Sequence, residues 1–503
     1  MPFNTVFSWL MGKRLPRIDE CRDNPIASQR HIFKFLISQG KLTYFGRKNQ
    51  FESIRVFADY SKFVPLQDYG TLKVLIDRSI LGEQDLLWPG KTNWFAKSSG
   101  TTADRIKILP VTSNSLFNNH YAGGKDLLAQ YYANLPDRKL FNAKHLIVGG
   151  SGETQQNENG VFVGDLSAII INNLPWWTEW RRAPRKEIAL QSDWEKKLND
   201  MANATIKENI CILAGVPSWT LLLLKRVLEI TGKETLAQVW PNLELYIHGG
   251  MNFGPYQAQF DELIGKTSMN YVESYNSSEG YFGLQDQLNS KELLLLTNSE
   301  VFYEFIPMTE FDGIQSKKVI SLEDVQTDVD YALVISTSAG LWRYIIGDTI
   351  RFSSTKPFRF HVTGRTSHFI NGFGEKMITD HTEKAISETC AKTNSAISDY
   401  TVAPYFNLKN SNGGHEWLIE FTKEPDNLEN FKIQLDESLK KYNSDYEVKR
   451  YHNLNIDFPK YHFVEKGTFH RWLKSKNKLG GQHKVPRLLN SREILEQILQ
   501  KND

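Results

Sequence analysis

The sequence predicts an α/β protein with a large N-terminal domain, residues 1–365, and a smaller C-terminal α+β domain, residues 366–503. Three observations predict this class. From about residue 140, short β-rich runs bounded by glycines alternate with longer helical stretches, a pattern typical of parallel sheets covered by helices. Between about 290 and 365 the strand patterns follow one another without helices, which predicts an antiparallel sheet or a β-barrel-like part joined to the parallel sheets. Helical patterns return after that point.

The first ninety residues are expected to form a helical lead-in. In residues 27–40, "ASQRHIFKFLISQG", apolar side chains recur three and four positions apart, which is the spacing of one face of a helix. Gly40 suits the end of such a helix.

Three glycine-bounded runs are the expected parallel strands: "KHLIVGGSG" at 144–152, "ENICILAGVP" at 208–217 and "LELYIHGG" at 243–250. A helix is expected between the second and third runs, at 219–232, "WTLLLLKRVLEITG". Because strands alternate here with helices, we expect the strands to run parallel.

The expected antiparallel strands are "ELLLLTNSEVFYEFIP" at 292–307, "YALVISTSAGLWRYIIGDTIRF" at 331–352 and "FRFHVTGR" at 358–365. The small domain then begins with a helical segment at 382–393 and contains a long amphipathic segment at 427–443. The chain length of 503 residues is in keeping with two or three domains.

Composition excludes several classes of protein. The 60 Lys and Arg residues are balanced by 58 Asp and Glu residues, so no strongly basic surface for nucleic acid is expected. Cys21, Cys211 and Cys390 lie far apart, fit neither a disulfide framework nor a zinc site, and suit a reducing compartment. The N-terminus does not resemble a signal peptide, and the apolar runs are too short to cross a membrane. We expect a cytoplasmic protein that binds no membrane; nothing predicts its oligomeric state.

Two stretches resemble catalytic motifs, but each lacks a glycine that its motif requires. "PGKTN" at 89–93 lacks the first glycine of a phosphate-binding P-loop, because Asp85 stands there. "GGSGE" at 149–153 has Glu153 where a nucleophile elbow needs its closing glycine, so a hydrolase is not favoured. The histidines form no pair at metal-ligand spacing, and we expect no metal held by the protein alone.

Four polar segments remain, and their order along the chain is informative. A polar turn after a strand would account for any one of them alone. They are "SSGTTADRIK" at 98–107, "ESYNSSEGYFGLQ" at 273–285, "GLWRYIIGDTIRF" at 340–352 and "VTGRTSHFINGFGEKM" at 362–377. The first cannot bury an apolar face, and its hydroxyls, glycine and following lysine suit a phosphate group.

Taken together, these segments resemble the adenylate-forming superfamily of acyl-CoA synthetases, peptide-synthetase adenylation domains and luciferases. Within it the sequence is most similar to the Gretchen Hagen family of acyl-acid amido synthetases. The sequence motifs that carry this similarity are "SSGTT", "YNSSEGYFG", "YEFIP" at 303–307 and "RYIIGD" at 343–348, together with the tail "KGTFHRWLKSKNKLGGQHKVPR". The resemblance covers nearly the whole chain. It implies the superfamily fold, with a small domain that swings about a hinge expected near 364–372.

The resemblance implies a phosphate-binding role for the first segment. The residues that would hold the β- and γ-phosphates of ATP are Ser98, Ser99, Gly100, Thr101 and Thr102. Gly100 would let the backbone approach the phosphates closely. Ala103 and Asp104 depart from the usual pattern, in which a second glycine or serine is common, while Lys107 keeps the basic end.

The resemblance also assigns the adenosine and metal contacts. Ser278 would contact the α-phosphate, and Glu279 would hold the magnesium ion that accompanies ATP and act in catalysis. Asp348 would accept hydrogen bonds from both ribose hydroxyls. The residues that would flank the adenine are Tyr275, Asn276, Gly250 and Met251. Arg365 would add a cation towards the ribose or phosphate, and Lys376 and Lys484 are alternative catalytic lysines for the α-phosphate.

The predicted function is therefore ATP- and magnesium-dependent adenylation of a carboxylic acid, followed by acyl transfer to an amine, expected to be an amino acid. Activating the acid as an adenylate divides an unfavourable condensation into two easier steps. Two alternatives stay open: coenzyme A as the acceptor, and a non-catalytic protein that binds a nucleotide or a small acid. The segments at 172–186 and 215–223, rich in Trp, Arg and aliphatic residues, are candidates for the acyl pocket, although the second could equally be core.

Overall fold

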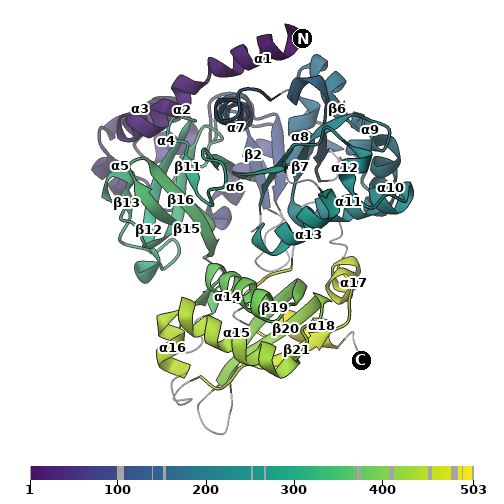
Figure 1. The fold of residues 1–503 in the computed structure, drawn as a ribbon. Helices are drawn as coiled ribbons and strands as arrows, with labels where there is room; N and C mark the ends of the chain where they lie inside the picture. Colours follow the sequence, from purple (N-terminus) through teal and green to yellow (C-terminus); the bar gives the residue numbers. More distant parts are fainter. Residues whose placement is uncertain are drawn as a thin grey trace.

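The structure is a computed structural model that describes residues 2–98, 107–138, 140–150, 155–250, 253–265, 268–366, 369–370, 375, 377–406, 413–450, 456–476, 485–489 and 491–500. Figure 1 shows a large upper body and a smaller unit, formed from α14 onward, below it. The fold is mixed α/β, as the sequence predicts. None of the helices in the described residues has the length and apolar content that crossing a bilayer requires.

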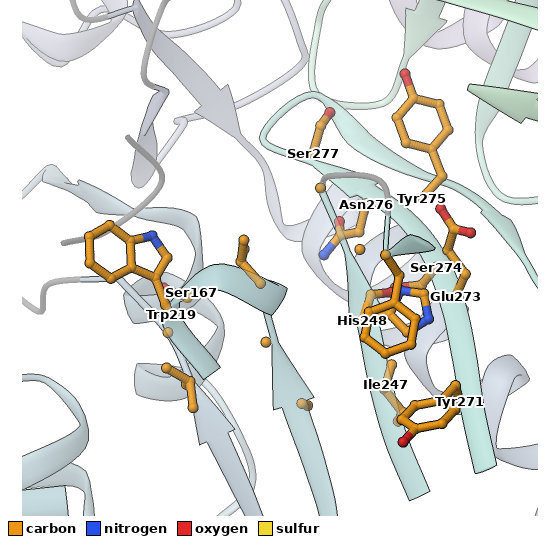
Figure 2. A pocket seen from close by; sticks show the side chains of 18 of the residues that line it. Ser167, Trp219, Ile247, His248, Tyr271, Glu273, Ser274, Tyr275, Asn276 and Ser277 are labelled. Atoms are coloured by element: carbon orange, nitrogen blue, oxygen red, sulfur yellow. The ribbon is translucent and has the colours of Figure 1, made fainter. Parts of the chain in front are cut away.

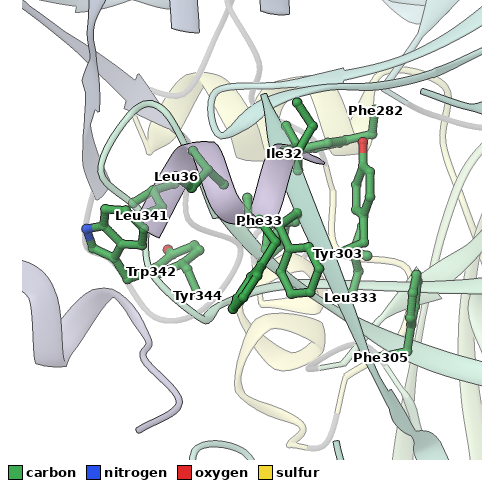
Figure 3. Close-up of a cluster of buried hydrophobic side chains, with 14 of the residues drawn as sticks. Ile32, Phe33, Leu36, Phe282, Tyr303, Phe305, Leu333, Leu341, Trp342 and Tyr344 are labelled. Carbon is green, nitrogen blue, oxygen red and sulfur yellow. The ribbon is translucent and has the colours of Figure 1, made fainter. Parts of the chain in front are cut away.

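The helical lead-in is present. Its helices are α1 (Pro2–Gly12), α2 (Leu15–Asp23), α3 (Pro25–Gly40), α4 (Tyr44–Lys48), α5 (Phe57–Phe63) and α6 (Tyr69–Ile80). Helix α3 starts with a proline in its first turn, where the missing N–H removes no hydrogen bond, and it ends at the predicted Gly40. Its buried residues Ile32, Phe33 and Leu36 recur at helical spacing and pack against strand residues such as Phe282 and Tyr303 (Figure 3).

One large sheet organises the upper body. Within the described residues it has twelve strands in the order β13-β12-β14-β15-β16-β11-β10-β9-β8-β7-β3-β6. The parallel strands are β3 (Lys144–Val148), β6 (Arg182–Ala183), β7 (Ile210–Gly215), β8 (Leu245–Gly249) and β9 (Asn270–Ser277). The predicted runs at 144–152, 208–217 and 243–250 are β3, β7 and β8, so their parallel arrangement is confirmed.

The antiparallel strands continue the same sheet. They are β10 (Gly280–Leu284), β11 (Leu293–Leu295), β12 (Val301–Pro307), β13 (Ile320–Ser321), β14 (Asp330–Thr337), β15 (Tyr344–Thr355) and β16 (Phe358–Arg365). They fill the expected stretch, but their order is linear, so this part extends the parallel strands instead of closing as a separate barrel. The hairpin of β9 and β10 makes the join, because β9 pairs in parallel with β8 and antiparallel with β10.

Helices cover both faces of the parallel strands. They are α7 (Tyr121–Asn134), α9 (Lys186–Ala189), α10 (Trp194–Thr205), α11 (Pro217–Thr231), α12 (Leu236–Val239) and α13 (Gly254–Ile264). Helix α8 (Leu166–Asn172) packs instead on a second, smaller sheet. Successive strand residues enter different cores: Ile212 packs with α7, whereas Leu213 packs with α10, α11 and α13. A second sheet has the order β2-β1-β5-β4, from β1 (Trp94–Ser98), β2 (Lys107–Val111), β4 (Gln155–Gln156) and β5 (Phe162–Asp165).

The C-terminal unit has its own core. Its sheet has the order β19-β20-β21, from β19 (Ala396–Phe406), β20 (Gly413–Lys423) and β21 (Lys460–Val464). A short pair, β17 (Phe369–Ile370) and β18 (Met377–Ile378), precedes it. Its helices are α14 (Thr379–Lys392), α15 (Leu428–Tyr442), α16 (Ser444–Arg450), α17 (Thr468–Ser475) and α18 (Glu493–Leu499). Trp417, Ile419 and Phe431 belong to a cluster that links its sheet to α15. The unit touches the large body where α14 meets α13 and β16.

Candidate active site

In the described part of the chain, the predicted site residues line one large cavity of about 2050 Å³. Its walls come from the end of β1, the start of β2, helices α7, α8, α11 and α13, the strand ends of the large sheet and the C-terminal unit. Figure 2 shows part of it, with Trp219 on one side and the side chains of β9 on the other. The described predicted residues that line it are Ser98, Gly250, Tyr275, Asn276, Ser278, Glu279, Asp348 and Arg365. The other predicted positions, Ser99, Gly100, Thr101, Thr102, Met251, Lys376 and Lys484, lie outside the described residues.

Asp348 lies at the centre of a buried cluster. Strands β15 and β16 place Asp348 directly opposite Arg365, whose Nε lies 3.2 Å from Oδ1 of the carboxylate. The hydroxyl of Tyr275, from β9, donates a 2.5 Å hydrogen bond to Oδ2. Asp348 raises the pKa of Arg365, and burial together with Asp348 holds the pKa of Tyr275 well above its usual range. The carboxylate is therefore fixed in orientation by two partners, with lone pairs left for further donors.

Ser278 and Glu279 occupy the turn between β9 and β10. Gly280 pairs with Ser277, so the two residues between them form the tip of a tight hairpin. Ser277 donates a 2.7 Å hydrogen bond to Oε2 of Glu279, while burial raises the pKa of Glu279 and Lys107 opposes that rise. The Ser278 hydroxyl is buried and has no hydrogen-bond partner within the described part of the chain. This turn thus presents a carboxylate and a hydroxyl donor to the cavity.

The end of β8, beside β9, forms another part of the cavity wall. Gly249 pairs with Ser274 of β9, and a Cβ atom at Gly249 would lie 2.3 Å from the Ser274 carbonyl oxygen. Gly250 has φ of +76°, a conformation that glycine adopts without strain. In the same part of the cavity wall, Oδ1 of Asn276 lies 3.1 Å from Nδ1 of His120, and burial lowers the pKa of that histidine to about 4. A neutral His120 can donate this hydrogen bond and hold the asparagine in place.

Glu273 is a cavity residue that the sequence analysis missed. It pairs with His248 across β8 and β9, and Figure 2 shows its side chain beside that histidine. Burial raises its pKa to about 7. The alternation of side chains along a strand could have indicated Glu273 as a site residue. It lies two residues before Tyr275, so both side chains project from the same face of the strand. A hydrophobic neighbourhood for a carboxylate could not be recognised from the motif alone.

Both candidate acyl segments line the cavity. The first contributes Pro175, Thr178, Arg181 and Arg182, and the second contributes Val216, Trp219, Leu221 and Leu222. Leu223 and Leu224 of the second segment are fully buried in the core beneath α11. The segment therefore serves both purposes, because alternate faces of one helix meet the cavity and the core.

Similar solved structures show which fold the chain has, and family models show which family it belongs to. The chain has the fold of the adenylate-forming ligases: it resembles a 2-hydroxyisobutyryl-CoA ligase in the postadenylation state with 2-HIB-AMP, with a TM-score of 0.60, 11% identity, and coverage of 96% of this chain and 94% of that one. It resembles AtGH3.15 acyl acid amido synthetase in complex with 2,4-DB more strongly, with a TM-score of 0.80, 17% identity, and coverage of 97% and 95%. The fold is thus the one shared by adenylate-forming ligases.

The chain belongs to the GH3 family. The GH3 family N-terminal domain matches residues 14–269, the central domain residues 294–365 and the C-terminal domain residues 380–493. Among curated relatives, indole-3-acetic acid-amido synthetase GH3.3 of Arabidopsis thaliana is 22% identical over 96% of this chain and 93% of its own length. The 4-substituted benzoates-glutamate ligase GH3.12 of the same plant is 23% identical over 96% and 85%. The resemblance to this family is confirmed.

Proposed function

We propose that the protein uses ATP to adenylate a carboxylic acid and then transfers the acyl group to the amine of an amino acid, forming an amide. The observation that carries this proposal is the convergence of residues from separate segments on one cavity: Ser98, Tyr275, Ser278, Asp348 and Arg365. Their chemistry matches a nucleotide: a fixed carboxylate, hydroxyl donors and cations around a space large enough for several substrates. The family relatives named as amido synthetases support an amino acid as the acceptor.

The geometry supports a specific set of proposed adenosine contacts. Asp348 would accept hydrogen bonds from the two ribose hydroxyls, because Tyr275 and Arg365 each engage one of its oxygens and leave lone pairs on both. The adenine ring would lie between the Gly249–Gly250 backbone and the Tyr275–Asn276 segment. Glu273, close to this space, is placed to accept a hydrogen bond from the adenine amino group.

The triphosphate would lie between the hairpin turn and the start of the second sheet. Ser278, whose buried hydroxyl has no partner among the described residues, would donate to the α-phosphate. Ser98 and Lys107 flank the 99–106 segment and both line the cavity, so a phosphate-binding loop between them would face the nucleotide. Positioned donors of this kind stabilise the charge that develops during the displacement of pyrophosphate.

Glu279 suits magnesium that arrives with ATP. Magnesium takes one or two carboxylates and completes its shell with phosphate oxygens and water, so a single buried carboxylate is sufficient. The described residues contain no group of three or more His, Cys, Asp or Glu side chains that could hold a metal alone. Bound there, the ion would neutralise phosphate charge, and Glu279 would stay ionised despite its burial.

The proposal also assigns separate roles to the two domains. We place the boundary at 365/366, with residues 366–503 as a mobile domain that brings Lys376 or Lys484 to the α-phosphate. The three cysteines, which are free and spread over the chain, support a site of action in the cytoplasm.

The test is pyrophosphate release with ATP, magnesium and a library of carboxylic acids. We expect release with some acids and, on addition of amino acids, an amide product identified by mass spectrometry. Replacing the amino acids by coenzyme A tests the thioester alternative directly. Failure of every acid to release pyrophosphate or exchange it into ATP would leave only the binding-protein alternative.

A further inference from the structure

One face of the parallel strands forms an apolar slot within the cavity. Ile147 of β3, Ala214 of β7 and Ile247 of β8 lie next to one another in register, and all three line the cavity. Helices α7 and α8 contribute further lining residues, Leu128 and Ile170. An acyl chain would bury apolar surface in this slot without meeting a polar group.

The slot ends among basic side chains. His145 lies two residues before Ile147 on β3, so it projects from the same face of the strand. Arg182 of β6 is the register partner of His145 on the edge of the sheet. Arg181 and Lys125 also line the cavity, and burial together with nearby Arg14 lowers the pKa of Lys125.

The guanidinium of Arg182 is incompletely satisfied. The residue is 5% exposed, and its Nη2 donates to Glu179. Its Nε and Nη1 are buried and have no hydrogen-bond partner in the described part of the chain, and the same holds for Nε2 of His145. Asp126, the acidic residue next to Lys125 on α7, is occupied by Arg14, whose Nε lies 2.7 Å from its carboxylate. Buried donors without acceptors are costly, which indicates that a ligand completes them.

We propose that Arg182 and His145 bind a second acidic group of the acyl substrate, at the end opposite to the carboxyl that is adenylated. The inference rests on the proposed function and deepens it: the preferred acids carry two anionic groups, such as dicarboxylic acids. Each free N–H group of the Arg182 guanidinium can donate a charge-assisted hydrogen bond to a carboxylate. An anion bound beside His145 would favour the protonated ring, whose Nε2 then becomes a further donor.

Sheet geometry sets the length of such an acid. Strand β6 lies four strand spacings from β9, which corresponds to about 19 Å across the sheet. Because Ser274 and Ser278 flank the expected reaction centre on the β9 side, a short diacid would not reach both ends of the slot. We therefore expect selectivity to rise with chain length.

The experiment compares saturated α,ω-dicarboxylic acids with monocarboxylic acids of the same length in ATP–pyrophosphate exchange. The wild type should prefer the long diacids. In Arg182→Gln, kcat/KM for diacids should fall at least tenfold through KM, while the value for monocarboxylic acids stays within twofold. Arg185→Gln is the matched control, because Arg185 is exposed three residues further along the chain.

A second variant, His145→Leu, keeps the test informative if Arg182→Gln does not fold. It should lower the diacid preference in the same direction, by a smaller factor. Exchange with monocarboxylic acids but no diacid preference, or an equal loss for both series in either folded variant, would show that Arg182 is only structural and would overturn the inference. Absence of exchange with every acid would instead overturn the proposed function, and the inference with it.

Discussion

At the scale of single residues, Asp348 shows how a site is prepared before a ligand arrives. Its carboxylate is 5% exposed and is held from two sides by Tyr275 and Arg365, which come from different strands. The orientation of the carboxylate is therefore set by the protein itself, and a nucleotide would add contacts without reorganising it.

Asp348→Ala should raise the KM for ATP and slow adenylation, because it removes charge-assisted hydrogen bonds to the ribose worth roughly 1.5–3 kcal/mol. The measurement is acid-dependent pyrophosphate exchange against ATP concentration. Asp330→Ala is a suitable control, since Asp330 of β14 binds Arg351 of β15 at 2.6 Å and neither residue lines the cavity. Unchanged ATP dependence in the folded Asp348 variant would contradict the ribose assignment.

Glu273 predicts a pH dependence of stability. Burial raises its pKa to about 7, so between about pH 4.5 and 7 the folded protein binds a proton that the unfolded chain has released. This group therefore lowers stability as the pH rises through that window. In Glu273→Gln the melting temperature should fall less between pH 5 and pH 8 than in the wild type.

The control for this measurement is Glu262→Gln on α13, where the side chain is exposed. Its melting curves should follow the wild type at each pH. If Glu273→Gln and Glu262→Gln behave alike, the carboxylate of Glu273 is solvated in the folded protein and its raised pKa is wrong.

The sequence predicted several residues of the site, but it did not predict all of the contacts around them. The resemblance of their sequence segments to the family motifs identified Tyr275, Ser278 and Asp348, and all three line the cavity. Their roles towards ATP stay predictions. Arg182 lies in the segment 172–186 predicted for the acyl pocket, but its pairing with His145 was not predicted, because a contact between strands that far apart in the chain leaves no local signal.

At the scale of elements, the strand β15 depends on a buried ion pair. Arg343, just before β15, has φ of +44° and directs its guanidinium to Glu304 of β12, with Nη2 2.8 Å from Oε1. The same guanidinium donates to the Val64 carbonyl oxygen at 2.7 Å. The segment that leads to Asp348 is thus fastened both to the sheet and to the helical lead-in.

Glu304→Gln should destabilise the protein by about 3–5 kcal/mol, because it leaves a charge buried without its partner. The midpoint of chemical denaturation is the measurement. The comparison is Glu323→Gln, which breaks the exposed pair between Glu323 and Arg30 and should change stability by less than about 0.5 kcal/mol. Similar midpoints for the two variants would mean that water reaches Arg343.

Elements were predictable where the pattern is local. Helix α3 and strands β3, β7 and β8 follow directly from periodicity and glycine boundaries. The second sheet was not anticipated: β1 pairs with β5 across a long stretch of chain, and β4 has only two residues. The sequence left open whether the antiparallel strands form an open sheet or a barrel, since both share the same local strand pattern, and the structure shows the open sheet.

At the scale of the whole molecule, two bodies meet at the cavity. Residues of α14, β19 and the α17 region line it together with the large sheet. A salt bridge between Lys474 and Glu195, at 2.6 Å, joins the two sides at the surface. Exposed pairs of this kind contribute little free energy, so the contact permits relative movement.

Ser367→Pro tests the predicted hinge at 364–372, although position 367 itself lies outside the described residues. Proline fixes φ and restricts the preceding residue, so it should impair one half-reaction more than the other. Pyrophosphate exchange reports adenylation, and amide formation from the same enzyme reports transfer. Equal loss of both activities in the folded variant, or loss of neither, would argue against a swinging domain.

The unbroken hydrogen-bonded ladder from β13 to β6 has a consequence for hydrogen exchange. Strands that share one ladder open together, so their backbone amides should exchange with deuterium slowly and as a single cooperative unit. The ladder of β19, β20 and β21 is separate and should open on its own, with its own protection factors. In a deuterium-labelling experiment, Asp348 on β15 and Ile147 on β3 would therefore lie in one protected block, and the lysine-rich C-terminal part of the chain in another.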